Sequence, residues 1–185
     1  LHAHPMLLLI PGPVQTRPEV RAAAAADIAP WDDEFRAEYA AMRPRIVRIA
    51  GGMEGEHAAL PLPGCGHMVV EAAVRTFVPA GGRLLVVRNG SYADRLIRLA
   101  TEAGRAVVPL DGADTEPMAP ERLAAALAAN PDCTHVAVVV SETGSGIVND
   151  IAALGAVTRA AGRRLICDAV SGFGALSFRI ADHPE

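Results

Sequence analysis

Short apolar runs alternate with longer segments of helical spacing along most of the chain. Runs of four to six residues that are rich in valine, leucine and isoleucine are typical of buried β-strands. The expected strands are residues 83–87, 105–110, 136–140 and 164–167. Apolar residues at helical spacing predict a helix between each pair of successive strands. These helices are residues 92–103, 120–130 and 151–161.

Three further helices are expected ahead of the first strand. They are residues 18–27, 34–50 and 67–77. Pro44 should interrupt the second of them, because proline lacks the N–H group that a helix interior needs.

Strands separated by helices of about ten residues favour βαβ units, and therefore an α/β fold with a mostly parallel sheet and flanking helices. The strands are continuously apolar rather than alternating, which fits a sheet that is covered on both faces. A chain of 185 residues is long enough to bury a real core in one domain.

Composition narrows the possible functions. Half of the residues are hydrophobic, which argues against disorder, and the longest apolar runs are far too short to span a bilayer. The formal net charge is −4, and arginines are scattered among acidic residues, so neither a membrane nor a nucleic acid is expected as a partner. The three cysteines lack metal-ligand spacing, which favours reduced thiols in a cytoplasmic protein and no metal site.

Asp168 is the most informative single residue. It ends the last apolar run and is followed by small residues and glycine, so it should lie at the carboxyl end of a buried strand. Open α/β sheets hold their ligands at that edge. A carboxylate there can stabilise a protonated ring nitrogen, as pyridoxal phosphate chemistry requires. The alternative is an aspartate that only caps a turn.

Three other polar segments are expected at the same edge. Residues 63–67 (PGCGH) precede a helix whose N-terminus could hold a phosphate, although the segment could also be a simple turn. In residues 89–92 (NGSY), the tyrosine could stack on a planar ring or be a half-buried core residue. Residues 141–146 (SETGSG) suit a polar ligand or form an ordinary flexible loop.

The chain contains no lysine, and all seventeen basic residues are arginine. An enzyme that carries pyridoxal phosphate as a Schiff base needs a lysine. We therefore expect the chain to be the front part of such an enzyme, with the catalytic amine beyond Glu185. Both ends look cut rather than finished, and Met6 is the expected natural start.

Taken together, these motifs resemble the class V aminotransferases of fold type I, and among them the enzymes that act on 2-aminoethylphosphonate. The matching segments run in the family's order over nearly all of residues 7–182. They are residues 7–14, 31–35, 64–67 with 70–72, 89–92, 141–146 and 168–174.

The resemblance implies a role for each cofactor-binding residue. Tyr92 stacks on one face of the pyridine ring, Val170 packs on the other, Thr143 lies near the ring hydroxyl, and Asp168 pairs with the ring nitrogen. The residues that line the cofactor phosphate, chiefly through backbone N–H groups, are Cys65, Gly66 and His67.

On the substrate side, the resemblance places the loop of Pro11, Gly12 and Pro13. The family often has hydroxyl residues at the positions of Cys65 and His67, so hydroxyl contacts to the phosphate would be lost there, whereas backbone contacts would survive. The family's Schiff-base lysine should fall roughly nine residues past Glu185. In the family this lysine also acts as the general base on the substrate.

The resemblance also implies a domain organisation. Residues 1–30 form an N-terminal arm and substrate-side loop, residues 31–185 form an incomplete cofactor-binding large domain, and the small C-terminal domain is absent. The full-length protein would move the amino group of 2-aminoethylphosphonate to pyruvate, giving phosphonoacetaldehyde and L-alanine, as a homodimer. The 185-residue chain alone is expected to be inactive.

Two alternatives remain open. The parent enzyme could be an alanine–glyoxylate or serine–pyruvate aminotransferase of the same class, since only the C-terminal part separates these substrates cleanly. The chain could also be a non-catalytic remnant of the fold. A nucleotide-binding domain is disfavoured because both phosphate-loop fingerprints are missing.

Overall fold

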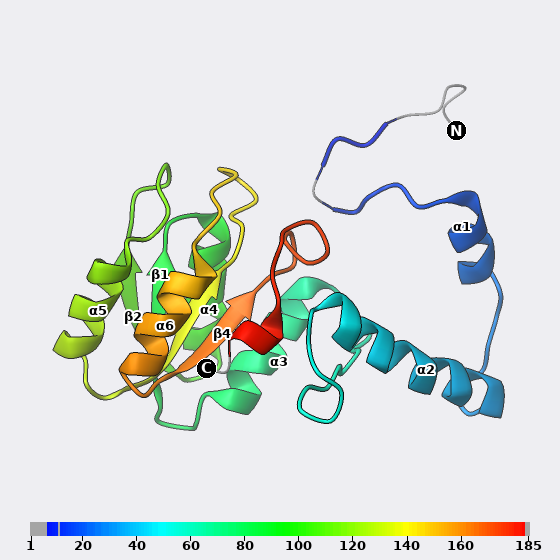
Figure 1. The fold of residues 1–185 in the computed structure, drawn as a ribbon, viewed down its shortest axis with the longest axis horizontal. Helices are drawn as coiled ribbons and strands as arrows, with labels where there is room; N and C mark the ends of the chain where they lie inside the picture. Colours follow the sequence, from blue (N-terminus) through cyan, green and yellow to red (C-terminus); the bar gives the residue numbers. More distant parts are fainter. Residues whose placement is uncertain (1–6, 11, 184–185) are drawn as a thin grey trace.

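A parallel sheet of four strands forms the centre of the computed structural model, which describes residues 7–10 and 12–183. The strands lie in the order β2-β1-β3-β4 (Figure 1). Their bounds are Arg83–Arg88 for β1, Ala106–Asp111 for β2, Cys133–Val139 for β3 and Arg164–Asp168 for β4. All three neighbouring pairs are parallel, as the alternation of strands and helices predicts.

The inner strands are apolar on both faces because helices cover both. Residues 84–87 of β1 are completely buried. β2 is an edge strand, and it tolerates Pro109 because an edge strand has one row of backbone groups outside the ladder.

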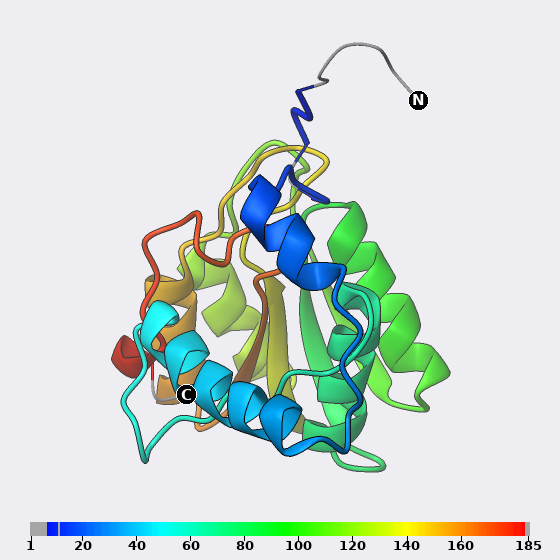
Figure 2. The same cartoon turned by 90° about the vertical axis from the view of Figure 1, so that its right-hand side faces the viewer.

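Two pairs of helices enclose the sheet (Figure 2). One face is covered by α3 (Gly66–Phe77) and α4 (Ser91–Glu102), whose apolar side chains pack on Leu84 and Val86 of β1. The opposite face is covered by α5 (Pro120–Ala129) and α6 (Ile151–Ala160).

The connections between strands diverge at the centre of the sheet. From β1 the chain passes through α4 to β2 on one side, and from β2 it returns through α5 to β3 on the other side of β1. The carboxyl ends of β1 and β3 therefore flank the point where ligands bind in sheets of this kind.

The N-terminal part projects from this body (Figure 1). It contains α1 (Pro18–Ala24), which buries no residue, and α2 (Asp33–Ile49), which buries only Val47. The expected interruption at Pro44 is wrong, since α2 is continuous through it. Ala40, whose carbonyl loses its helical partner to the proline, is exposed and can be satisfied by water.

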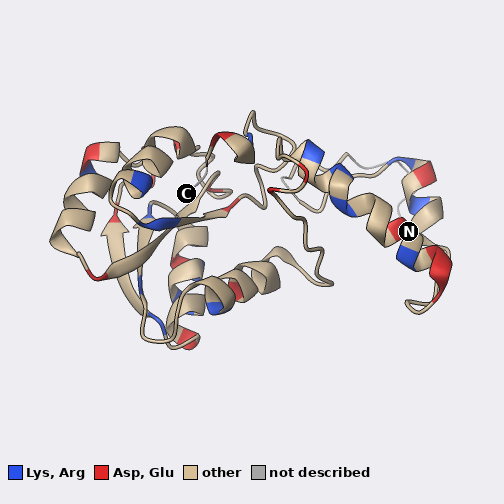
Figure 3. Cartoon of the chain, turned by 60° about the horizontal axis from the view of Figure 1, so that its bottom comes forward, with Lys and Arg blue, Asp and Glu red and all other residues tan. Residues whose placement is uncertain are grey.

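Acidic and basic residues are interspersed along the helices, strands and loops (Figure 3). None of the helices in residues 7–10 and 12–183 combines the length and hydrophobicity needed to cross a lipid bilayer. After β4, the last described residues form a loop that carries a short 3-10 helix, η1 (Ile180–Asp182).

Candidate active site

Two adjoining cavities open at the carboxyl edge of the sheet. We call the larger, of about 440 Å³, the edge cavity; Thr143, Ser141 and Ser171 are part of its lining. The smaller, of about 260 Å³, is the α3–α4 cavity, and Arg95 and Leu99 are part of its lining.

Each site residue that the sequence singles out, and that the structure describes, lines one of these cavities. Pro11 lies outside the described residues. The predicted residues that line the edge cavity are Gly12, Pro13, Cys65, Gly66, Tyr92, Thr143, Asp168 and Val170. Those that line the α3–α4 cavity are Cys65, Gly66, His67, Tyr92, Asp168 and Val170.

Asp168 is the last residue of β4 and lies opposite Val139 of β3. Its Oδ1 accepts a hydrogen bond of 3.1 Å from the backbone N–H of Val170, so it closes the turn after the strand as well as lining both cavities. In the described part of the chain no hydrogen bond engages Oδ2, which leaves this oxygen able to accept one from a ligand.

Tyr92 is held in place by a carboxylate that sequence reasoning missed. Glu142, in the loop after β3, is completely buried, and its two oxygens accept the backbone N–H groups of Tyr92 at 3.1 Å and Ala93 at 2.9 Å. These bonds and the positive end of α4 offset the cost of burying the charge. A Cβ at Gly90 would lie 2.4 Å from the Glu142 carboxyl group, so a side chain there would displace Glu142 from these bonds.

A buried pair of amides, Asn89 and Asn149, connects the loops that follow the strands. The Nδ2 of Asn89 donates to Oδ1 of Asn149 at 2.9 Å, and the same oxygen accepts the N–H of Met118 at 3.0 Å. The Nδ2 of Asn149 donates to the carbonyl of Val139 at 2.8 Å. Asn89 follows β1, Met118 lies in the loop after β2, and Val139 ends β3. The amide pair therefore fixes the ends of these three strands relative to one another.

The turn before α3 reaches this edge by packing, and not by following a strand. Between residues 50 and 65 the structure contains only an isolated bridge between Glu54 and His57, so no strand of the sheet precedes this turn. Instead α3 packs against α4 and β4. A Cβ at Gly66 would lie 2.6 Å from Val170, which explains the glycine at this close approach.

No side chain caps the start of α3, whose N-cap residue is Cys65. The first-turn N–H groups of a helix lack partners within the helix, and together with the helix dipole they favour an anion. In this fold the start of α3 lies at the edge cavity, which is also lined by the carboxylate of Asp168, the hydroxyl of Thr143 and the ring of Tyr92.

Arg95 is the second residue that sequence reasoning missed. Its Nη1 lies 3.1 Å from Nδ1 of His67, and its guanidinium carbon lies 4.9 Å from the centre of the Tyr92 ring. The signal was available, because a residue three positions after Tyr92 lies on the same face of a helix.

Three groups outside this site have shifted pKa values. Burial, aided by Asp132, raises the pKa of the Cys133 thiol, and burial, aided by Arg164, lowers the pKa of His135. Hydrogen bonds to Asp94 and Asp111 raise the pKa of Arg88. Groups of this kind line neither cavity, and residues 7–10 and 12–183 contain no cluster that could hold a metal ion.

Comparison with known proteins agrees with this picture. No family model matches the chain. A protein of Burkholderia lata named 2-aminoethylphosphonate–pyruvate transaminase 2 is 41% identical over 170 residues, which cover 92% of this chain and 45% of that protein. A 2-aminoethylphosphonate–pyruvate transaminase of Rhizobium meliloti is 38% identical over 175 residues, or 95% of this chain and 46% of that protein.

Among solved structures, the pyridoxamine–pyruvate aminotransferase from Mesorhizobium loti matches with a TM-score of 0.88 and 27% identity, covering 98% of this chain and 46% of that one. The chain thus spans about half the length of the curated relatives it matches. The resemblance seen in the motifs and the expected α/β fold are both confirmed. The chain is a homologue of the 2-aminoethylphosphonate–pyruvate transaminases over about half their length, and it has the fold of the pyridoxal-phosphate-dependent aminotransferases of fold type I.

Proposed function

We propose that the natural protein containing this chain is a pyridoxal-phosphate-dependent aminotransferase. It transfers the amino group of 2-aminoethylphosphonate to pyruvate and forms phosphonoacetaldehyde and L-alanine. The relatives' names supply the substrates. The observation that carries the proposal is the convergence of Tyr92, Thr143, Asp168 and Val170 on one cavity beside the start of α3.

The chemistry of these groups fits the cofactor. The cavity offers an aromatic face, an apolar branched side chain and a carboxylate for a flat basic ring, and an uncapped helix start for a phosphate. Glycine at position 66 lets the helix start come close to Val170. When bound, pyridoxal phosphate supplies an electron sink for the negative charge that develops at the substrate carbon.

The residues around the ring would hold it and set its charge. Tyr92 and Val170 would lie against its two faces and exclude water from them. The carboxylate of Asp168 would accept a hydrogen bond from the ring nitrogen and keep a proton on that atom, because an adjacent negative charge favours the protonated form. Thr143 would lie near the ring hydroxyl.

The first turn of α3 would bind the phosphate. The backbone N–H groups of Cys65, Gly66 and His67 would donate to its oxygens, which needs no hydroxyl side chain. Gly12 and Pro13, which line the edge cavity, border the substrate.

The proposal requires a lysine from elsewhere in the natural protein, because the 185 residues contain none. That lysine would be the base that moves the proton between the substrate carbon and the cofactor in each half-reaction. In this organisation residues 1–30 are an arm on the substrate side and residues 31–185 belong to the large domain. The cytoplasmic location expected from cysteine usage is part of the same proposal.

A homodimer is the proposed assembly. Apolar side chains in and near the projecting arm are exposed: Leu7 by 74%, Leu9 by 85%, Val14 by 60% and Trp31 by 79%. Large apolar side chains that are exposed in one segment favour cover by another chain. Light scattering on the natural protein should give the mass of a dimer, and a monomer at micromolar concentration would contradict this assembly.

The test of the activity is a donor and acceptor survey on the purified natural protein. We expect alanine and phosphonoacetaldehyde to form from 2-aminoethylphosphonate and pyruvate in equal amounts. Formation of glycine from alanine and glyoxylate at a higher kcat/KM would favour the alanine–glyoxylate alternative instead. Absence of transamination with every donor, in a protein that folds, would favour the non-catalytic alternative.

A further inference from the structure

Positive charge is scarce around the two cavities. Among the described residues that line them, Arg95 is the one arginine, and the sequence has no lysine. A phosphate dianion placed at the start of α3 would meet the helix dipole and this single guanidinium.

Arg95 reaches that helix start through His67. Arginine can only donate hydrogen bonds, so in the 3.1 Å contact between Nη1 and Nδ1 the imidazole nitrogen is the acceptor. The proton of the neutral ring then belongs on Nε2. His67 lines the α3–α4 cavity, and its Nε2–H is therefore a donor for a ligand there.

A second contact fixes the guanidinium. Its carbon lies 4.9 Å from the centre of the Tyr92 ring, within the range of a cation–π interaction. A planar guanidinium can stack on the ring and donate to the imidazole at the same time, whereas a lysine ammonium has no such fixed fork. Arg95 thus links the first turn of α4 to the first turn of α3.

We infer that Arg95 is a positioning residue that holds His67 as a hydrogen-bond donor to the cofactor phosphate. The inference rests on the proposed function and adds a residue to it. Arg95 and His67 both line the α3–α4 cavity and neither lines the edge cavity, where Thr143 lies. Because Arg95 reaches the start of α3 through His67, we expect its effect mainly at the phosphate end of the cofactor.

The test compares two probes that differ only in the phosphate. Dissociation constants of pyridoxamine 5′-phosphate and pyridoxamine are measured by absorbance or fluorescence titration of the natural full-length protein, because neither probe needs the catalytic lysine. The variants are Arg95→Met, which keeps the apolar stem, and Arg95→Lys. Arg98→Met is the matched control, since Arg98 is an exposed residue on the same helix and lines neither cavity.

We expect Arg95→Met to raise the dissociation constant of pyridoxamine 5′-phosphate by about tenfold or more, the scale of a lost charge-assisted hydrogen bond. The dissociation constant of pyridoxamine should stay within about twofold of the wild-type value. Arg95→Lys should lose nearly as much, and Arg98→Met should bind both probes normally. In a protein that already carries His67→Ala, Arg95→Met should cause little further loss, because the two residues act through one contact.

An equal loss for both probes would overturn the inference, because Arg95 would then act through the packing of α4. Unchanged binding of both probes by Arg95→Met would overturn it as well. Wild-type protein that binds neither probe would overturn the proposed function itself, and so separates that failure from the failure of the inference.

Discussion

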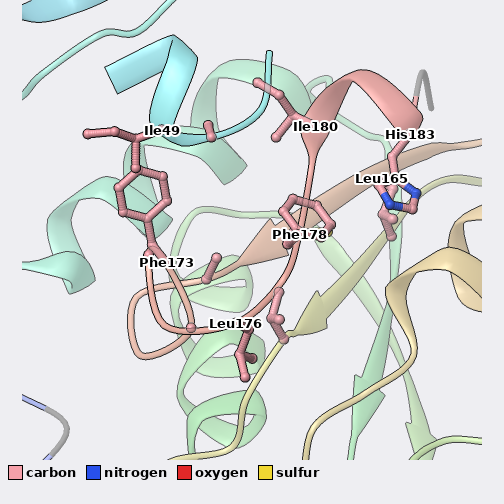
Figure 4. A pocket seen from close by; sticks show the side chains of 13 residues that line it. Ile49, Leu165, Phe173, Leu176, Phe178, Ile180 and His183 are labelled. Atoms are coloured by element: carbon pink, nitrogen blue, oxygen red, sulfur yellow. The ribbon is translucent and has the colours of Figure 1, made fainter. Parts of the chain in front are cut away.

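Two hollows flank the end of β4, and they differ in chemistry more than in size. The edge cavity is lined by residues from five separate segments, including Asp168 and Thr143. On the other side lies an apolar hollow of about 290 Å³ (Figure 4). Its lining includes Ile49 of α2, Leu165 of β4 and Phe178 of the last loop.

The difference follows from the alternation of side chains along one strand. Leu165 and Cys167 line the apolar hollow, whereas Ile166 packs with the α3–α4 side and Asp168 lines the two cavities there. A shift of β4 by one residue would exchange these sets and bring Cys167 to the candidate site. The comparison teaches that convergence of polar groups, and not enclosure by apolar walls, identifies the site.

The largest effect is expected from Asp168→Ala in the natural protein. Loss of the carboxylate removes the group that keeps the ring nitrogen protonated, so kcat/KM should fall by about a thousandfold, the scale of a lost electrostatic contact in an active site. Cys167→Ala, one residue away in the apolar hollow, is the control and should stay within about twofold of wild type. A fall of less than tenfold for Asp168→Ala would remove the distinction between the two hollows.

The buried amide pair of Asn89 and Asn149 should matter for stability. Asn149→Ala leaves the buried groups of Asn89, Met118 and Val139 without their partner, and the free energy of unfolding should fall by about 3 kcal/mol. Urea denaturation of the natural protein measures it. Val148→Ala, at an exposed neighbouring position, should cost less than about 0.5 kcal/mol. Equal losses in the two variants would show that the pair does not stabilise the loops.

A substitution in the apolar hollow should affect packing without affecting chemistry. Leu165 is half-buried against the core, so Leu165→Ala should lower the free energy of unfolding by about 1–2 kcal/mol, less than for a fully buried leucine. The kcat/KM per folded molecule should stay unchanged. A loss of activity as large as that of Asp168→Ala would mean that the hollow takes part in the reaction.

The smallest change is expected from pH. Burial lowers the pKa of His135 in the folded chain, so the unfolded chain binds more protons below its ordinary pKa of about 6.5. The stability contribution is therefore complete above that pH and is lost as pH falls below it. Urea denaturation at pH 7.5 and 5.5 should show this loss, and His135→Gln should reduce it. A pH dependence that His135→Gln leaves unchanged would assign it to other groups.

The strands and helices were readable from the sequence because their periodicity is local. Apolar runs and helix-ending glycines placed ten elements to within a few residues; β3 begins at Cys133, three residues before the expected start. The positions of Asp168 and Tyr92 at one edge followed from parallel topology. The mistake at Pro44 arose because proline's cost depends on whether water reaches the orphaned carbonyl, which the pattern does not show.

The supporting residues were not readable because their roles depend on contacts far apart in the chain. Glu142 looks like any loop carboxylate until its bonds to the start of α4 are seen. The partners Asn89 and Asn149 are sixty positions apart. Nor does the sequence show that the Gly66 turn reaches the edge by packing against Val170.

The most direct test of the central claim is a crystal structure of the natural protein soaked or grown with pyridoxal phosphate. The account expects the ring between Tyr92 and Val170, its nitrogen within hydrogen-bond distance of Asp168, and the phosphate on the first turn of α3. Cofactor bound in the apolar hollow beside Leu165, or an empty edge cavity at saturating cofactor, would contradict it.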